Sequence, residues 1–344
     1  MKKITLYTAA DKRPDFIPLQ YQSLKRFLKD EYEFVVLNNA LDSKKRQAEI
    51  SRICSELGIR CVKVTKDKKF NIIGEQKVFT WLGSYRNANV GTAYPIKWAW
   101  NMMIEENSHN LFAIIDSDMF LCRDISFIEE IGDNDSAIII QYRGPQERRS
   151  KMNVSYIWNA LCVFDASKIP DLKAMRWDCG TVNGHRVDVG GYIHHWFQNH
   201  KMNYRHMSEY AVHKYHGMQD GSYYLEGTLN GNYHFSFEYN DKTRVTKNFK
   251  SYERNWAESD LVLPHLRQGF ENVLTAKMIN YFERYIKNKQ TYPDPAFIGF
   301  IEFEDQQKKN KPFIIHSKAG SGYMRFGEQY GKMKLQFIEK ILEL

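Results

Sequence analysis

Short apolar runs alternate with amphipathic stretches over the first 64 residues, a pattern typical of strands and helices in turn. The apolar runs predict strands over residues 4–7, 33–37 and 60–64. Apolar residues spaced three and four apart predict helices over 15–29 and 43–57, and Gly58 ends the second helix. Strands joined through helices form parallel sheets with right-handed crossovers, so the pattern predicts an α/β fold.

The run Leu111–Ile115 is continuously apolar and rich in branched residues, as in a strand that is buried on both faces. It ends in Asp116-Ser117-Asp118, and residues 119–121 are apolar again. A buried carboxylate needs a partner or a metal, because desolvating an unpaired charge is costly. If the backbone turns after this strand, both carboxylates can reach one Mg²⁺ or Mn²⁺ ion. The alternative is a solvated loop that follows a core strand.

Other polar residues follow the predicted strands that precede this acidic turn. Thr8 and Ala9 follow the first strand, and Asn38 and Asn39 follow the second. Ligands of parallel α/β sheets bind beyond the carboxyl ends of the strands, so these residues and the acidic turn should share one rim. This convergence favours a binding site over a plain loop.

The middle of the chain adds a further carboxylate. We expect a helix opened by Pro95 over 96–106, strands over 136–141, 158–164 and 202–207, and a helix over about 190–200. Asp188 precedes the last helix, where it could act in chemistry or serve only as an N-cap. Gly190 and Gly191 would allow a substrate to approach closely. Arg86 and Lys97 could reach phosphates, or they are ordinary surface cations.

The C-terminal part contains a histidine at the end of a predicted strand. The run Phe313-Ile314-Ile315 leads into His316, and a neutral imidazole is a good ligand for Mn²⁺. The turn that follows contains Lys318, Gly320 and Ser321, and its cation and backbone N–H groups suit a diphosphate. His234 is the rival candidate ligand. Amphipathic helices are expected over 272–287 and 328–344.

Composition narrows the class of protein. A 43% apolar content and a mean hydropathy of −0.57 describe a soluble globular chain, and no apolar run reaches the roughly 20 residues of a membrane span. The N-terminus lacks the apolar core of a secretory signal. Five cysteines without metal-type spacing predict reduced thiols in the cytoplasm, with peripheral membrane association left open. A net charge of +8 suits an anionic partner, although the value is ordinary.

The order of these features resembles the GT-A-fold glycosyltransferases, which bind nucleotide-diphosphate sugars through a DxD motif. Asp116-Ser117-Asp118 matches that motif, and the resemblance extends from Asp188 through a helix to Glu209, as in many inverting members. Val187 departs from the pattern, because an acidic residue is usual there. The resemblance covers about residues 1–210. It implies a GT-A (Rossmann-like), mostly parallel central sheet flanked by helices over residues 1–240. A mainly helical extension over 241–344 would complete the active site in one structural unit.

The resemblance also implies a function. The chain would move a hexose or pentose from a nucleotide-diphosphate sugar to a hydroxyl of a glycan or glycoconjugate, with inversion. Asp116, Asp118 and His316 would hold Mn²⁺ or Mg²⁺, since the family often supplies a C-terminal histidine, and Asp188 would be the general base. The donor-binding residues would be Thr8, Ala9, Asn38, Asn39, Arg86, Lys97, Ser117, Lys318, Gly320 and Ser321.

Two other classes of protein remain open from the sequence. A sugar-phosphate nucleotidyltransferase shares nucleotide binding on a related sheet, but the turn after the first strand here is not a glycine-rich phosphate loop. A non-catalytic carbohydrate- or nucleic-acid-binding protein is suggested by the 14% aromatic content and the basic charge. A glycosyltransferase would need no nucleic-acid partner.

Overall fold

The computed structural model describes residues 3–66, 88–143, 153–217, 222–229, 233–240, 245–252, 298–304, 312–317 and five positions between 335 and 342. The chain divides into two compact units, Met1–Met207 and Ser208–Leu344. The sequence analysis placed a boundary after residue 240, and this position lies inside the second unit.

The first unit is built on a central sheet of mixed direction that is mostly parallel. Its strands lie in the order β6-β7-β4-β1-β2-β3. Strand β1 is parallel to β2 and β4, β2 is parallel to β3, and β7 is antiparallel to both β4 and β6. The bounds are β1 (Ile4–Ala10), β2 (Tyr32–Asn38), β3 (Arg60–Lys63), β4 (Leu111–Ile115), β5 (Met119–Leu121), β6 (Ser136–Arg143) and β7 (Val154–Asp165). The predicted α/β class is confirmed.

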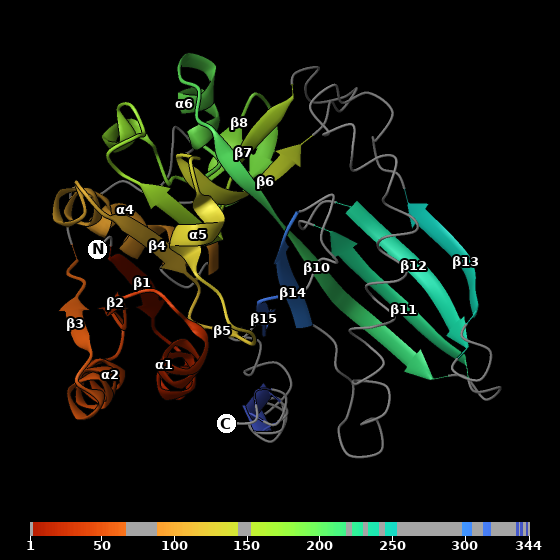
Figure 1. Ribbon diagram of the computed structural model, residues 1–344, viewed down its shortest axis with the longest axis horizontal. Coiled ribbons are helices and arrows are strands. Elements are labelled where there is room, and N and C mark those ends of the chain that lie inside the picture. Colours follow the sequence, from red (N-terminus) through yellow and green to blue (C-terminus); the bar gives the residue numbers. More distant parts are fainter. Residues whose placement is uncertain are drawn as a thin grey trace. The chain divides into compact units, whose positions relative to one another are not determined.

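Helices flank this sheet on both faces. Helices α1 (Phe16–Phe27) and α2 (Lys44–Leu57) lie on one side of β1–β3, and α4 (Ala88–Glu106) lies on the other (Figure 1). The α4 side contains an aromatic core in which Trp100 meets Phe112 and Trp177 edge-on, at centroid distances of 5.7 and 5.1 Å. The remaining elements are α5 (Phe127–Ile131), η1 (Leu172–Ala174), β8 (Gly180–Val182), β9 (His185–Val187), α6 (Ile193–Asn199) and β10 (Tyr204–Gly217).

Local sequence explains the ends of α2. The hydroxyl of Ser43 accepts a hydrogen bond from the backbone N–H of Arg46, as an N-cap should. Gly58 takes the left-handed conformation, with φ +67°, and ends the helix as predicted.

Helix α4 begins before Pro95, not after it as the sequence analysis expected. Proline inside a helix leaves the carbonyl four residues earlier without its backbone donor. That carbonyl belongs to Gly91, and the side-chain amide of Asn39 donates to it at 2.9 Å. A side chain distant in sequence therefore replaces the missing N–H, and the helix continues through the proline.

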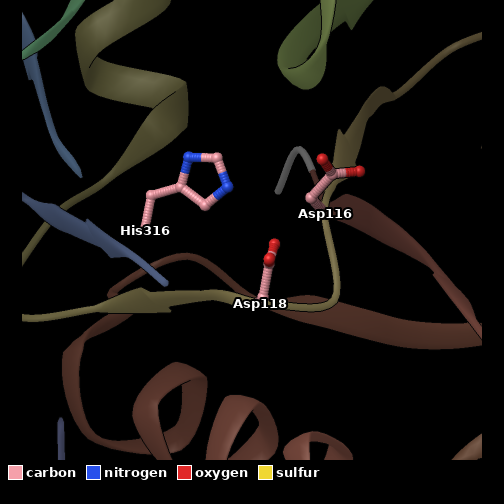
Figure 2. A group of neighbouring side chains, drawn as sticks. All are labelled: Asp116, Asp118 and His316. Atoms are coloured by element: carbon pink, nitrogen blue, oxygen red, sulfur yellow. The ribbon is translucent and has the colours of Figure 1, made fainter. Parts of the chain in front are cut away.

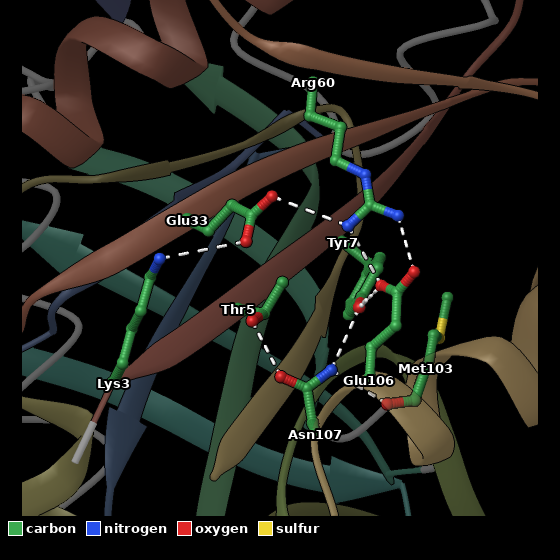
Figure 3. Close-up of polar contacts among 8 residues, drawn as sticks. All are labelled: Lys3, Thr5, Tyr7, Glu33, Arg60, Met103, Glu106 and Asn107. Carbon is green, nitrogen blue, oxygen red and sulfur yellow. Dashed lines mark hydrogen bonds and ion pairs between the residues drawn. The ribbon is translucent and has the colours of Figure 1, made fainter.

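A polar network joins strands β1, β2 and β3 to the end of α4 (Figure 3). Arg60 donates to both carboxylate oxygens of Glu106, at 3.0 and 2.5 Å, and Tyr7 donates to the same carboxylate at 3.0 Å. The buried amide of Asn107 donates to the Tyr7 hydroxyl and accepts from Thr5. This network fastens the end of α4 to the sheet.

The described part of the second unit consists mostly of strands. Strands β10, β11 (Ser222–Leu229), β12 (Tyr233–Asn240) and β13 (Val245–Tyr252) form successive antiparallel pairs. Strand β14 (Ile298–Phe303) pairs with β10 and with β15 (Ile314–His316). A mainly helical extension was expected from residue 241. The elements described there are β13, β14, β15 and five helical positions between 335 and 342, which lie within the predicted helix over 328–344. The predicted helix over 272–287 lies outside the described residues. Among the helices that the structure describes, none is long and apolar enough to cross a membrane.

Candidate metal and donor site

The acidic turn follows a strand that is buried along its whole length. Strand β4 ends at Ile115, as predicted. The backbone N–H of Asp116 donates to the carbonyl of Ala160 in β7 at 2.8 Å. The N–H of Met119 then donates to the carbonyl of Asp116 at 3.1 Å, which closes the turn. Asp116, Ser117 and Asp118 are all partly exposed. The backbone therefore turns at the point where two carboxylates could reach one cation.

His316 ends β15 and is held by a buried carboxylate. Its Nδ1 lies 2.5 Å from Oε1 of Glu209, and only 5% of His316 and 1% of Glu209 are exposed. Gly299 pairs with His316 across β14 and β15, and a Cβ at Gly299 would lie 2.5 Å from the same Glu209 oxygen. The glycine thus leaves room for the carboxylate. An imidazole whose Nδ1 donates to a carboxylate presents Nε2 as its metal-binding nitrogen.

Asp116, Asp118 and His316 form a group that could hold a metal ion. One ligand atom from each side chain lies within 4.8 Å of the other two (Figure 2). Two carboxylates with one neutral imidazole match the preferences of Mn²⁺, and the carboxylates alone would suit Mg²⁺. The sequence analysis selected these three residues, with His234 as the rival. The structure describes His234 only through the backbone of β12.

The polar residues expected at the rim differ in the hydrogen bonds that their side chains make. Thr8 and Ala9 lie within β1 itself, since this strand runs to Ala10. Thr8 is fully buried, and its Oγ1 has no hydrogen-bond partner among the described residues; the same holds for Oδ1 of Asn39. Asn38 is different, because its amide donates to the Gln47 carbonyl at 2.8 Å and to the Ser51 hydroxyl. Asn38 therefore anchors α2 to the sheet.

Asp188 is not a helix cap. Helix α6 begins at Ile193, and its N-cap is Tyr192, so the alternative role offered by the sequence is wrong. The Asp188 carboxylate instead accepts the N–H of Val189 at 2.8 Å, and its backbone N–H donates to the Tyr156 hydroxyl at 3.3 Å. Burial raises the pKa of that hydroxyl to about 12, so Tyr156 stays neutral beside the partly exposed carboxylate.

The two glycines after Asp188 are required by the protein's own packing. Gly190 has φ +83°, and a Cβ there would lie 2.6 Å from the carbonyl oxygen of Ile157. A Cβ on Gly191 would lie 2.1 Å from the Val187 side chain. The sequence analysis attributed both glycines to close approach of a substrate. The structure shows that neighbouring protein atoms fill the space where their side chains would lie.

Lys97 lies beside a fully buried carboxylate that the sequence analysis missed. Its Nζ lies 2.6 Å from one oxygen of Asp178, and Nε of Arg176 lies 2.9 Å from the other. Asp178 is completely buried, whereas Lys97 and Arg176 both keep some exposure. The two ion pairs compensate the buried charge of Asp178 and hold Nζ of Lys97 beside it. No motif marks Asp178, which stands in the sequence as one acid between tryptophan and cysteine.

Several expected donor-binding residues cannot be placed. Arg86, Lys318, Gly320 and Ser321 lie outside the described residues. Ser117 lies in the acidic turn, between the two aspartates.

The site and sheet together define an α/β protein with an acidic turn at a strand end and a carboxylate-bound histidine. No family model matches the sequence, and no curated protein sequence matches it. Among solved structures, the chain is similar to the galactosyltransferase LgtC in complex with donor and acceptor sugar analogues. That comparison has a TM-score of 0.29 and 13% identity, and it covers 58% of this chain and 67% of that one.

Proposed function

We propose that this chain is a metal-dependent glycosyltransferase that moves a sugar from a nucleotide-diphosphate sugar to a hydroxyl of a carbohydrate or glycoconjugate. The observation that carries the proposal is that Asp116, Asp118 and His316 each offer one ligand atom within 4.8 Å of the other two. A cation held by so few protein ligands keeps coordination positions for other oxygens, such as those of a diphosphate.

The ligands fit this cation in their chemistry and in their support. The carboxylates follow a rigid buried strand, and the turn between them is closed by a hydrogen bond. Glu209 orients the imidazole of His316, as carboxylates do beside many metal-bound histidines. When bound, the cation would neutralise charge on the donor diphosphate and so stabilise the leaving group.

The donor's nucleoside would lie against the rim formed by β1 and β2. Thr8 and Asn39 each have a buried oxygen that lacks a hydrogen-bond partner among the described residues, and a ligand could supply one. Ala9, which is partly exposed, would border the same surface. Lys97 is held in place by Asp178 and is the described cation that we assign to the donor phosphates. Arg86, Ser117, Lys318, Gly320 and Ser321 remain proposed contacts of the donor.

Asp188 would accept the proton of the acceptor hydroxyl. Its carboxylate is partly exposed and is fixed by the N–H of Val189, so it keeps one orientation without serving as a cap. A base that activates the acceptor on the face opposite the leaving group gives an inverted product.

The test is to incubate the protein with a panel of sugar nucleotides and Mn²⁺ and to measure the free nucleotide diphosphate. Asp118→Asn should abolish the metal-dependent release while the protein stays folded. Asp188→Asn should lower kcat by roughly 10²–10⁴-fold with KM nearly unchanged, as expected for loss of a general base. Asp15→Asn is the matched control, because Asp15 is an exposed acid of the same unit that pairs only with Arg13 among the described residues.

Other products would select other classes of protein. Release of pyrophosphate would favour a nucleotidyltransferase, and binding without any release would favour a carbohydrate-binding protein. Full Mn²⁺-dependent activity in Asp118→Asn would refute the metal site, and a product with retained configuration would remove the base role from Asp188.

A further inference from the structure

A buried glutamine on helix α1 donates to both ends of the acidic turn. Gln20 is completely buried, and its Nε2 donates to the carbonyl oxygen of Asp116 at 2.8 Å and to that of Met119 at 3.0 Å. Ser117 and Asp118 lie between these two carbonyls. One side-chain amide therefore spans the main chain on which both proposed carboxylate ligands stand.

The turn is held from its other side by the sheet. The N–H of Asp116 donates to the carbonyl of Ala160, and the N–H of Met119 donates across the turn to the carbonyl of Asp116. Beyond the turn, the N–H of Leu121 donates to the hydroxyl of Ser23, one helical turn after Gln20. Helix α1 and the sheet thus hold the acidic turn between them.

The uncharged amide of Gln20 suits these contacts. The NH₂ group of glutamine has two donors, which match two carbonyl acceptors, whereas an ionised glutamate offers acceptors alone. The other atom of the amide, Oε1, is buried and makes no hydrogen bond within the described part of the chain. A buried acceptor without a partner destabilises the fold, and an apolar residue would avoid this cost. An apolar residue at position 20 could not make the two hydrogen bonds to the carbonyls of Asp116 and Met119.

We propose that Gln20 is a positioning residue for the cation site: it fixes the main chain from Asp116 to Met119 and so sets the angle at which Asp116 and Asp118 meet a divalent cation. The inference rests on the proposed metal site for its consequence. Its structural basis, the two hydrogen bonds to the turn, does not depend on any ligand.

The test compares Gln20→Met with Asn107→Leu in the full-length protein. Asn107 is also a buried amide of the first unit. Its Nδ2 donates twice, to the Tyr7 hydroxyl and the Met103 carbonyl, neither of which belongs to the acidic turn (Figure 3). Electron paramagnetic resonance of free Mn²⁺ gives the Kd for Mn²⁺ alone. Gln20→Met should raise that Kd by roughly 10–100-fold, the range for losing support of a metal ligand, while Asn107→Leu leaves it unchanged. Both variants should lower Tm.

A second measurement separates this inference from the metal site itself. Hydrogen exchange of the Met119 amide, in the absence of metal, should be faster in Gln20→Met than in the wild type and in Asn107→Leu. Unchanged exchange in Gln20→Met overturns the positioning role, whether or not the protein binds Mn²⁺. Faster exchange together with a wild type that binds no Mn²⁺ keeps Gln20 as the support of the turn and refutes the metal site. Equal losses of Mn²⁺ affinity in both variants would reduce the effect to general stability and overturn the inference.

Discussion

Replacing Gly190 with alanine should destabilise the first unit much more than the same change at Gly58. Both glycines have positive φ, +83° and +67°, so alanine is strained at either position by about 1–2 kcal/mol. At Gly58 no atom lies within 4 Å of the added Cβ. At Gly190 the Cβ would lie 2.6 Å from the carbonyl oxygen of Ile157, a backbone atom that cannot rotate away.

The extra cost at Gly190 follows from this crowding. Overpacking a fixed site costs about 1–3 kcal/mol, so Gly190→Ala should lose that much more than Gly58→Ala. Alanine also reduces the entropy of the unfolded chain, but this effect is shared by both variants and cancels in their difference. The difference should shift Tm by roughly 2–4 °C for each kcal/mol in a unit of this size.

Urea unfolding followed by tryptophan fluorescence measures the difference, because Trp100 and Trp177 lie in the core of the same unit. The slope of the unfolding free energy against urea concentration should be unchanged in both variants, because unfolding exposes the same surface area in each. Equal losses at Gly58 and Gly190 would refute the crowding argument and return Gly190 to the substrate role expected from the sequence.

Two further predictions concern titratable groups. Iodoacetamide at pH 7 should alkylate Cys61 before the other four cysteines, because a hydrogen bond with Cys54 lowers the pKa of Cys61 to about 6. The same hydrogen bond raises the pKa of Cys54, and burial raises the pKa of the other three thiols. Mass spectrometry of the peptides gives the order of labelling, and any other cysteine reacting first would contradict it. Hydrogen bonds with Arg60 lower the pKa of Glu106 below its ordinary value. Its ionised form therefore stabilises the fold at neutral pH, and this stabilisation is lost as the pH falls through the lowered pKa. Glu106→Gln should cost about 0.5–1 kcal/mol of unfolding free energy at neutral pH and nothing in acid, and urea titrations at several pH values test this.

Features that depend on neighbours in sequence could be predicted well. The bounds of β4 and the end of α2 at Gly58 each follow from a few consecutive residues. The acidic turn belongs to this group too, because an abrupt change from apolar to acidic residues marks the end of a buried strand.

Features that depend on distant partners could not be predicted. A proline reads locally as a helix start, yet Asn39 satisfies the Gly91 carbonyl and lets α4 begin earlier. An apolar run predicts a strand but not its direction, so the antiparallel placement of β7 was not foreseen. Gln20 carries no local signal, since the residues that it contacts lie almost a hundred positions away.

The register of β1 against β4 bears on when the acidic turn takes shape during folding. Ile4 pairs with Leu111, far along the chain, whereas β11 and β12 join residues as close as Leu229 and Tyr233. Strand pairs between residues distant in sequence form slowly, because the entropy of closing a long loop is lost before the stabilising contacts form. We therefore expect the hairpins of the second unit to form early. The turn that carries Asp116 and Asp118 should take its geometry only in the last steps of folding.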